Sequence, residues 1–333
     1  MIFEYLRKVY TLGLLSPFIK LAGFPWKGKG AILMYHRILP DDKMNEDLDL
    51  GMAVSCSDFE KQIKTLKSKY SLVSIDDFIK NLENNKKIFM VNITFDDGYK
   101  DNLTYALPIL EKYKVPASIY ITTRFLEKNV SMWWYEIKKI INNKKNLNFT
   151  YGNKNYNFKL ETKKQKLLAF NIIKKLFTEL KFENQVDLLE EISEKNKREN
   201  YSKICLNADE VVSLNKNSLI TLGSHSHTHL NMKVLDEKEI INEVLKSSKI
   251  LENLTNKKVK HFAYPFGMKE HASLREYNII KNLEFNSAVT GQVLPIKSYN
   301  LFSLPRIYVG KNTCEKTLIN HLSGFYNLIN KFI

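Results

Sequence analysis

Thr94-Phe95-Asp96-Asp97-Gly98-Tyr99 is one of two short stretches around which the chain is organised. The second is Gly223-Ser224-His225-Ser226-His227-Thr228-His229. Each comes directly after an apolar, β-rich run, and each is therefore predicted to lie at the end of a strand. Strand ends are where α/β sheets and barrels present their functional residues. Two carboxylates and three imidazoles brought to one rim favour a metal-assisted hydrolase.

The segments on either side of these stretches alternate between predicted strands and predicted helices. Strand patterns occur at 31–35, 89–95, 117–122, 219–223, 261–264, 287–290 and 302–309, and helical patterns at about 57–70, 74–84, 100–110, 208–214, 236–254 and 313–332. Ser57-Asp58-Phe59-Glu60 predicts a capping box at the start of the first of these helices. Alternation at this spacing favours a largely parallel α/β fold.

Residues 127–202 interrupt this alternation. The segment opens with Trp133-Trp134 and a helical run, and alternating apolar residues around Gly152-Asn153 then predict a β-hairpin. Two Lys- and Glu-rich helical segments follow. The thin apolar content predicts an insertion between barrel strands rather than an independent domain. The two tryptophans either line a sugar platform or pin the insertion onto the barrel, and the second reading is preferred because paired large aromatics usually bury.

Composition narrows the classes of partner. A chain of 333 residues with 44% hydrophobic residues can build one large barrel or two ordinary domains. Three separated cysteines (Cys56, Cys205 and Cys314) indicate neither a disulfide framework nor a thiolate zinc site. The net charge of +15 fits an anionic membrane surface, or else a solvated basic surface without a partner. No nucleic-acid recognition motif occurs, so no nucleic-acid partner is predicted.

We expect residues 1–28 to form an amphipathic N-terminal segment, 29–310 the barrel and 311–333 a C-terminal helix. The apolar run from Val9 to Phe24 is broken by Pro17 and Lys20, so it is too short to span a bilayer. It is either an interfacial anchor helix or a helix packed against the barrel. Without a clear secretory cleavage site, the sequence predicts a cytoplasmic or inner-membrane-associated protein. The oligomeric state is not predicted.

The histidine cluster predicts a metal site with two alternative geometries. On a helical turn, His225 and His229 share a face and chelate one ion, while His227 points elsewhere. If the segment stays extended, residues four apart are roughly 13 Å from each other, and a pair that includes His227 would bind instead. In either geometry two imidazoles need a third ligand, and a carboxylate completes a 2-His-1-carboxylate set.

The adjacent carboxylates predict a division of roles. In a continuing strand Asp96 and Asp97 would face opposite ways. Gly98 permits a sharp turn that brings both to one site, where one binds the metal and the other acts as general base. Alternatively, the Asp-Asp-Gly turn only caps the helix that begins near Lys100. The neighbouring histidine cluster favours the functional interpretation.

These residues resemble the motifs of a known family, the NodB-homology polysaccharide deacetylases of carbohydrate esterase family 4. Its first two motifs run Thr-Phe-Asp-Asp-Gly and His-Ser/Thr-x-x-His. Tyr264-Pro265-Phe266-Gly267 is similar to the third motif, Arg-x-Pro-Tyr-Gly. Tyr35-His36-Arg37, Pro116-Ala117-Ser118 and Leu304-Pro305-Arg306-Ile307 also resemble branches of the family. The similarity covers roughly residues 30–310 apart from the insertion, and four motifs in the right order are specific.

The resemblance implies an α/β fold, a distorted (β/α)7 barrel, that removes acetyl groups from N-acetylated sugars. We expect a bacterial polysaccharide or a lipid-linked glycan as substrate. Carried onto this chain, the resemblance implies a divalent metal on Asp97, His225 and His229, with Asp96 as base. Zinc suits such a set, as do iron, cobalt and nickel. The expected substrate contacts are Tyr264, Pro265, Phe266 (whose N–H would also bind the oxyanion) and Trp134.

The chain departs from the family pattern at two positions. Ala263 replaces the third-motif arginine, and we hypothesise that Arg306, at another strand end, supplies that guanidinium. The late Leu-x-x-His motif with the usual acid is not evident after Leu304. His36, at the end of the first strand, is the candidate for that acid or for a substrate contact. For Arg306 and His36, a buried residue with a satisfied hydrogen bond is the equally weighted alternative.

Three other functions compete with deacetylation. A phosphoesterase could use the same metal ligands. A catalytically weakened, glycan-binding barrel is favoured by the missing arginine and histidine. An inverting glycosidase is disfavoured because adjacent aspartates cannot easily stand the roughly 6.5–9.5 Å apart that this mechanism needs.

Overall fold

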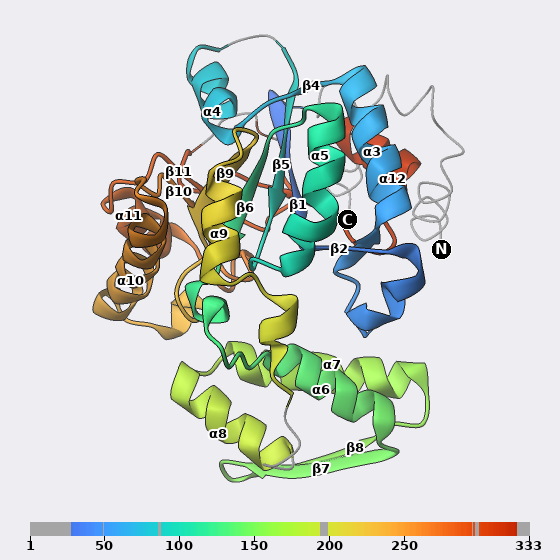
Figure 1. Ribbon diagram of the computed structural model, residues 1–333. Helices are drawn as coiled ribbons and strands as arrows, with labels where there is room; N and C mark the ends of the chain where they lie inside the picture. Colours follow the sequence, from blue (N-terminus) through green and yellow to red (C-terminus); the bar gives the residue numbers. More distant parts are fainter. Residues whose placement is uncertain are drawn as a thin grey trace.

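A computed structural model describes residues 28–48, 50–85, 88–193, 199–294, 296 and 300–324. The candidate anchor helix lies in residues 1–27, and the end of the expected closing helix lies in 325–333, both outside the described residues. Figure 1 shows one sheet flanked by helices and a smaller unit of helices with a hairpin beyond one end of that sheet. Among the described helices, none is both long and apolar enough to cross a membrane.

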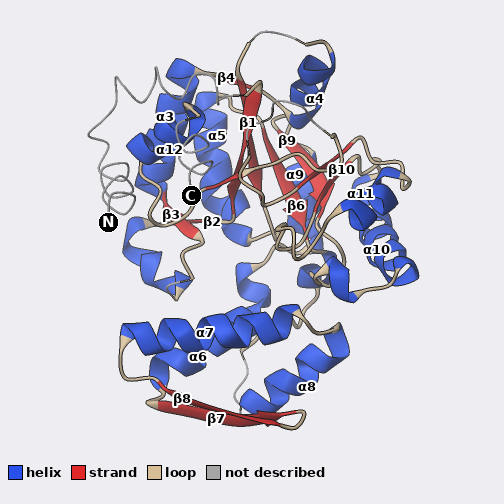
Figure 2. Ribbon diagram, turned by 180° about the vertical axis from the view of Figure 1, so that it is seen from behind, coloured by secondary structure: helices blue, strands red, loops and turns tan. Residues whose placement is uncertain are grey.

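A curled, all-parallel sheet forms the centre of the molecule, as the alternation predicted. Seven strands follow the order β11-β10-β9-β6-β5-β1-β12, and β4 pairs with β5. Every residue of β1, β5 and β6 is buried, because helices such as α5 (Leu107–Tyr113) and α9 (Ala208–Asn215) cover the outer side of the curled sheet (Figure 2) and buried side chains, among them Ile32 and Tyr120, fill its inner side. The strands are β1 (Gly30–Tyr35), β4 (Ser71–Leu72), β5 (Met90–Phe95), β6 (Ala117–Ile121), β9 (Ile220–Ser224), β10 (His261–Ala263), β11 (Ser287–Val289) and β12 (Ile307–Tyr308).

The last expected strand, at 302–309, connects the two edges of this sheet. Only β12 is regular strand, and it pairs with β1. Upstream, Leu304 pairs with Val289 of β11. Pro305 lies between the two pairings and has no N–H to donate, which prevents one continuous strand. The predicted length was therefore wrong. Because it pairs with both edge strands, the segment curls the sheet toward a closed (β/α)7 barrel and places Arg306 at the rim.

The predicted barrel helices are present with corrected bounds, since α5 begins only at Leu107 and α12 ends at Leu322. The sequence pattern did not predict α11 (Leu274–Lys281). Ser55, not Ser57, caps the first helix, because the Ser55 hydroxyl accepts the Asp58 N–H. Ser57 lies in the first turn and donates to Asp41. The helices are α3 (Cys56–Lys69), α4 (Ile75–Glu83), α5 (Leu107–Tyr113), α9 (Ala208–Asn215), α10 (Glu237–Thr255), α11 (Leu274–Lys281) and α12 (Glu315–Leu322).

Shorter elements complete the barrel. A π-helical turn, η3 (Asn102–Ala106), precedes α5, so the helix after the Asp-Asp-Gly turn does not start as a regular α-helix. A small parallel pair, β2 and β3, lies beside it. The remaining elements are β2 (Arg37–Leu39), β3 (Ala53–Ser55), η2 (Asp41–Asp47), η4 (Thr123–Leu126), η6 (Tyr201–Ile204) and η7 (Met232–Val234).

The insertion between β6 and β9 has a hydrophobic cluster of its own. The β7–β8 hairpin turns at Gly152-Asn153, as predicted. The Trp133 ring stacks on Phe177 with centroids 4.6 Å apart, inside a cluster that includes Ile137, Phe149 and Leu188. This is more apolar content than the Lys- and Glu-rich sequence suggested. The elements are α6 (Trp133–Asn143), β7 (Asn146–Tyr151), β8 (Lys154–Lys159), α7 (Lys163–Thr178) and α8 (Phe182–Ile192).

A buried ionic cluster joins the insertion to the barrel. Arg37 of β2 donates to the Asp101 carboxylate at 2.8 Å and to the Tyr135 hydroxyl of α6 at 3.0 Å. The Tyr135 ring in turn stacks on Tyr201 at 5.4 Å. Because removing one partner of a buried pair leaves an uncompensated charge, this cluster holds α6 firmly beside the Asp-Asp-Gly turn.

Candidate functional site

The turn after β5 places both carboxylates at one cavity. Asp97 (φ 73°) and Gly98 (φ 83°) both adopt the left-handed conformation. Aspartate tolerates this region better than most residues, and glycine enters it freely. The chain therefore reverses directly after the strand, and Asp96 and Asp97 are both buried while lining the same cavity.

A loop, not a helical turn, brings the paired histidines together. Ser226 (φ 64°) and His229 (φ 59°) are left-handed, and the Ser226 hydroxyl accepts the His229 N–H at 3.1 Å. The His225 and His229 rings consequently lie 5.0 Å apart. His227 faces away, with Nδ1 3.0 Å from the Thr123 hydroxyl. The i, i+4 pair of the first alternative is present, but neither the helical nor the extended conformation was right.

Asp97, His225 and His229 form a set of donors that fits a divalent cation. Asp97 Oδ1 lies 3.5 Å from His225 Nε2 and 3.3 Å from His229 Nε2. One ligand atom from each residue falls within 4.8 Å of the others. His225 Nδ1 lies 2.8 Å from the Ala263 carbonyl oxygen. Since a carbonyl only accepts, Nδ1 carries the hydrogen and the Nε2 lone pair faces the centre of the set.

Arg306 holds Asp96 in a bidentate ion pair. Its Nη atoms lie 2.7 and 2.6 Å from the two carboxylate oxygens. The guanidinium also donates to the Thr290 carbonyl at 2.9 Å and to the Thr94 hydroxyl at 3.1 Å. Burial raises the pKa of Asp96, but the charge and hydrogen bonds of Arg306, together with the nearby His225 and His36, lower the pKa below its ordinary value. Asp96 is therefore ionised and fixed in orientation, and Arg306 provides the guanidinium that Ala263 cannot.

His36 presents an unsatisfied nitrogen beside the carboxylates. It follows β1 and lines the cavity with Asp96 and Asp97. Its Nδ1 is buried and has no hydrogen-bond partner within the described part of the chain. Burial lowers the pKa of His36, while Asp97 and Asp96 oppose that shift. The alternative of a structural histidine with satisfied hydrogen bonds therefore does not hold for this nitrogen.

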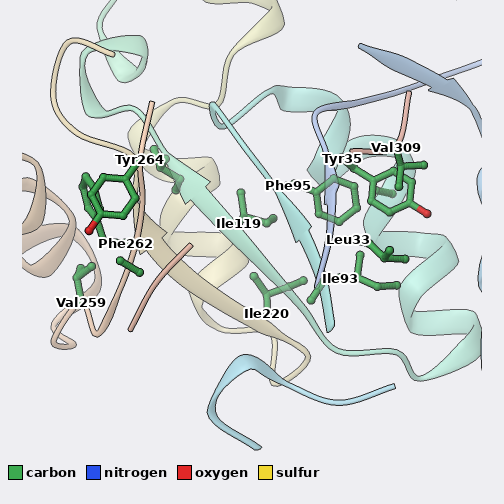
Figure 3. Close-up of a cluster of buried hydrophobic side chains, with 14 of the residues drawn as sticks. Leu33, Tyr35, Ile93, Phe95, Ile119, Ile220, Val259, Phe262, Tyr264 and Val309 are labelled. Carbon is green, nitrogen blue, oxygen red and sulfur yellow. The ribbon is translucent and has the colours of Figure 1, made fainter. Parts of the chain in front are cut away.

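The third-motif residues divide between core and cavity. The Phe266 ring lies 4.7 Å from the His229 ring and lines the cavity. Tyr264 also borders the cavity, but its hydroxyl donates to the Phe302 carbonyl at 2.9 Å and its ring packs beside Phe262 in the core (Figure 3). The Pro265 carbonyl accepts the Gly267 N–H at 2.7 Å, and Pro265 is not among the described cavity-lining residues.

The insertion supplies one wall of the cavity, which has a volume of about 740 Å³. Trp134 is buried, and its ring lies 5.4 Å from the His229 ring. Its indole Nε1 has no partner among the described residues. The tryptophan pair thus pins the insertion and also borders the site. The cavity-lining residues of α7 were not predicted, because no sequence motif marks them. They are Phe170, Asn171, Lys174, Lys175 and Thr178.

Gly267 and Gly152 have similar φ angles, but their surroundings differ, so we expect alanine at the two positions to lower the free energy of unfolding by different amounts. A Cβ on Gly267 (φ 68°) would lie 2.2 Å from the Gly291 nitrogen, whereas a Cβ on Gly152 (φ 58°) would meet nothing within 4 Å. We expect Gly152→Ala to lower the free energy of unfolding by about 1 kcal/mol. Gly267→Ala should cost on the order of 3 kcal/mol, because the loop that carries Phe266 must move. Urea unfolding of both variants checks this, and equal losses would contradict it.

Known proteins resemble this chain in sequence pattern and in fold. The family model "Polysaccharide deacetylase" matches residues 83–285. Among curated proteins, none matches the sequence significantly. A Streptococcus pyogenes deacetylase, PplD, solved with acetate, is 18% identical, covers 88% of this chain and 97% of its own, and has a TM-score of 0.59. IcaB from Ammonifex degensii is 14% identical over 89% of this chain and 97% of its own, with a TM-score of 0.56. At these identities the two structures establish the fold.

Proposed function

Because the chain belongs to the polysaccharide deacetylase family, we propose that it is a metal-dependent hydrolase that removes acetyl groups from N-acetylated sugars. The substrate is a bacterial polysaccharide or a lipid-linked glycan. One observation carries the proposal: the buried Asp97–His225–His229 set lies directly beside a carboxylate, Asp96, that a buried arginine orients.

Asp97, His225 and His229 would hold the divalent cation. Zinc suits this donor set, and iron, cobalt or nickel share it. Such an ion, when bound, acidifies water and polarises a carbonyl group. The Ala263 carbonyl keeps His225 in the tautomer that ligates through Nε2.

The remaining residues act on the substrate and on protons. Asp96 accepts a proton from the attacking water, and Arg306 positions that carboxylate. The N–H of Phe266, at the cavity wall, is the proposed donor to the developing oxyanion. His36, in its protonated form, gives a proton to the departing amine, and the proton that Asp96 took from the water restores it. Trp134 offers an aromatic face and an N–H to the sugar.

His36→Ala is expected to lower the turnover of acetate release by about 10²-fold and to leave the metal content unchanged. The matched control is His271→Ala, since His271 also lines the cavity and also has a buried, unpartnered Nδ1. Steady-state turnover and metal analysis of both variants test the assignment. Full turnover in His36→Ala, or a larger loss in His271→Ala, would remove His36 from the mechanism.

The proposed function is tested by the group that the enzyme releases. We expect acetate from one or more members of a panel of soluble N-acetylated oligosaccharides, and no phosphate from a parallel panel of phosphate esters. Phosphate release alone would identify a phosphoesterase that uses the same ligands. Glycan binding with no product would identify a barrel that has kept recognition and lost turnover. Either result would overturn the proposal.

A further inference from the structure

Helix α7 has an outward face with large apolar side chains. Leu167, Leu168 and Ile172 are 56%, 60% and 37% exposed. The inward face buries Ile173 and Phe177 among other residues of the insertion cluster. The outward face is therefore not needed for the core of the insertion, and three neighbouring exposed aliphatic residues on one helix are typical of an interaction surface.

This apolar face belongs to the helix that forms one wall of the cavity. Asn171, between Leu168 and Ile172, and Lys175, one turn after Ile172, both line the cavity. On the barrel side, Met268 and Tyr308 also line the cavity and are 42% and 39% exposed. Exposed apolar side chains thus border the cavity mouth from the insertion and from the barrel.

The positive charge of α7 favours an anionic partner for this apolar face. The helix contains five lysines and no acidic residue, in a chain of net charge +15. Lys175 pairs with Glu179 at 3.8 Å. Lys163 and Lys164 have no acidic partner among the described residues. A helix with apolar residues flanked by lysines is suited to lie in the interface of a bilayer that contains anionic lipids.

We propose that the outward face of α7 docks this protein onto an anionic membrane surface. Leu167, Leu168 and Ile172 enter the headgroup region, and Lys163 and Lys164 contact lipid phosphates. A symmetric contact with a second copy is disfavoured, because it would place this lysine-rich helix against itself. Docking does not depend on the deacetylase assignment. If both hold, the cavity mouth lies beside the bilayer, which deepens the proposed function by favouring a lipid-linked glycan as substrate.

The test is co-sedimentation of the full-length chain with vesicles of phosphatidylcholine, alone or mixed with phosphatidylglycerol. We expect binding to the mixed vesicles. The variant Leu167→Ser/Leu168→Ser/Ile172→Ser should reduce the partition coefficient about tenfold or more. The matched control is Leu245→Ser/Leu274→Ser, two exposed leucines on α10 and α11, which should bind like the wild type. Lys163→Gln/Lys164→Gln should weaken binding to the mixed vesicles only.

Three outcomes would overturn this proposal: no binding to the mixed vesicles, binding unchanged by the triple substitution, or a dimer in solution that the triple substitution dissociates. Acetate release from a soluble oligosaccharide is measured on the same preparations and should be equal in the wild type and the triple variant. Failure of the wild type to release acetate would contradict the proposed function and leave the vesicle result intact.

Discussion

Asp96→Asn is expected to lower acetate release by roughly 10²–10⁴-fold while the protein keeps its metal. Asparagine has nearly the shape of aspartate, but its amide cannot take a proton from water at neutral pH. Asp96 is not one of the three residues whose ligand atoms converge, so the cation should remain bound. The measurement is acetate release together with metal analysis of the same sample.

Asp101→Asn provides the matched control for this variant. Asp101 is also buried and also pairs with a buried arginine, Arg37, but it does not line the cavity among the described residues. It should lose stability and keep its turnover. Equal losses of turnover in Asp96→Asn and Asp101→Asn would mean that a broken ion pair, not a missing base, causes the effect.

Arg306→Leu should have the largest effect on stability. It leaves the Asp96 carboxylate buried without its bidentate partner, which typically lowers the free energy of unfolding by about 3–5 kcal/mol. Acetate release should also fall, because the orientation of the base is lost. Arg306→Lys keeps the charge without the planar fork, so it should recover stability more than turnover.

A double-mutant cycle isolates the Asp96–Arg306 interaction. Asp96→Asn removes the charge that Arg306→Leu leaves unpaired, so the double variant should be more stable than the sum of the single losses predicts. Urea unfolding of the wild type, both single variants and the double variant gives the coupling. Additive losses would show that Arg306 stabilises the rim through Thr290 and Thr94 rather than through Asp96.

The sequence predicted the position of the site because strand ends can be recognised locally. The apolar runs before Asp96 and His225 have the length and composition of buried strands, and the carboxyl ends of parallel strands meet at one rim. The pairing of Arg306 with Asp96 was foreseen as a hypothesis on the same ground. The loop that joins His225 to His229 could not be foreseen, because left-handed serine and histidine carry no pattern of their own.

The other differences arise from contacts between distant segments. Tyr264 sits in a motif associated with substrate, yet its hydroxyl meets the Phe302 carbonyl, which only the fold brings near. Ser55 rather than Ser57 caps α3, since both fit the pattern and the backbone decides between them. The wall that α7 adds to the cavity depends on how the insertion packs, and the Arg37–Tyr135 bond that anchors it joins residues far apart in sequence.

The central claim is that metal on Asp97, His225 and His229 enables acetate release. The most direct measurement compares acetate release and metal content for the wild type as purified, after treatment with a chelator, and after return of zinc, with Asp97→Ala treated in parallel. Activity of the wild type should vanish with the metal and return with it, whereas Asp97→Ala should neither hold the metal nor recover. Full acetate release by the metal-free wild type, or by Asp97→Ala, would contradict the account.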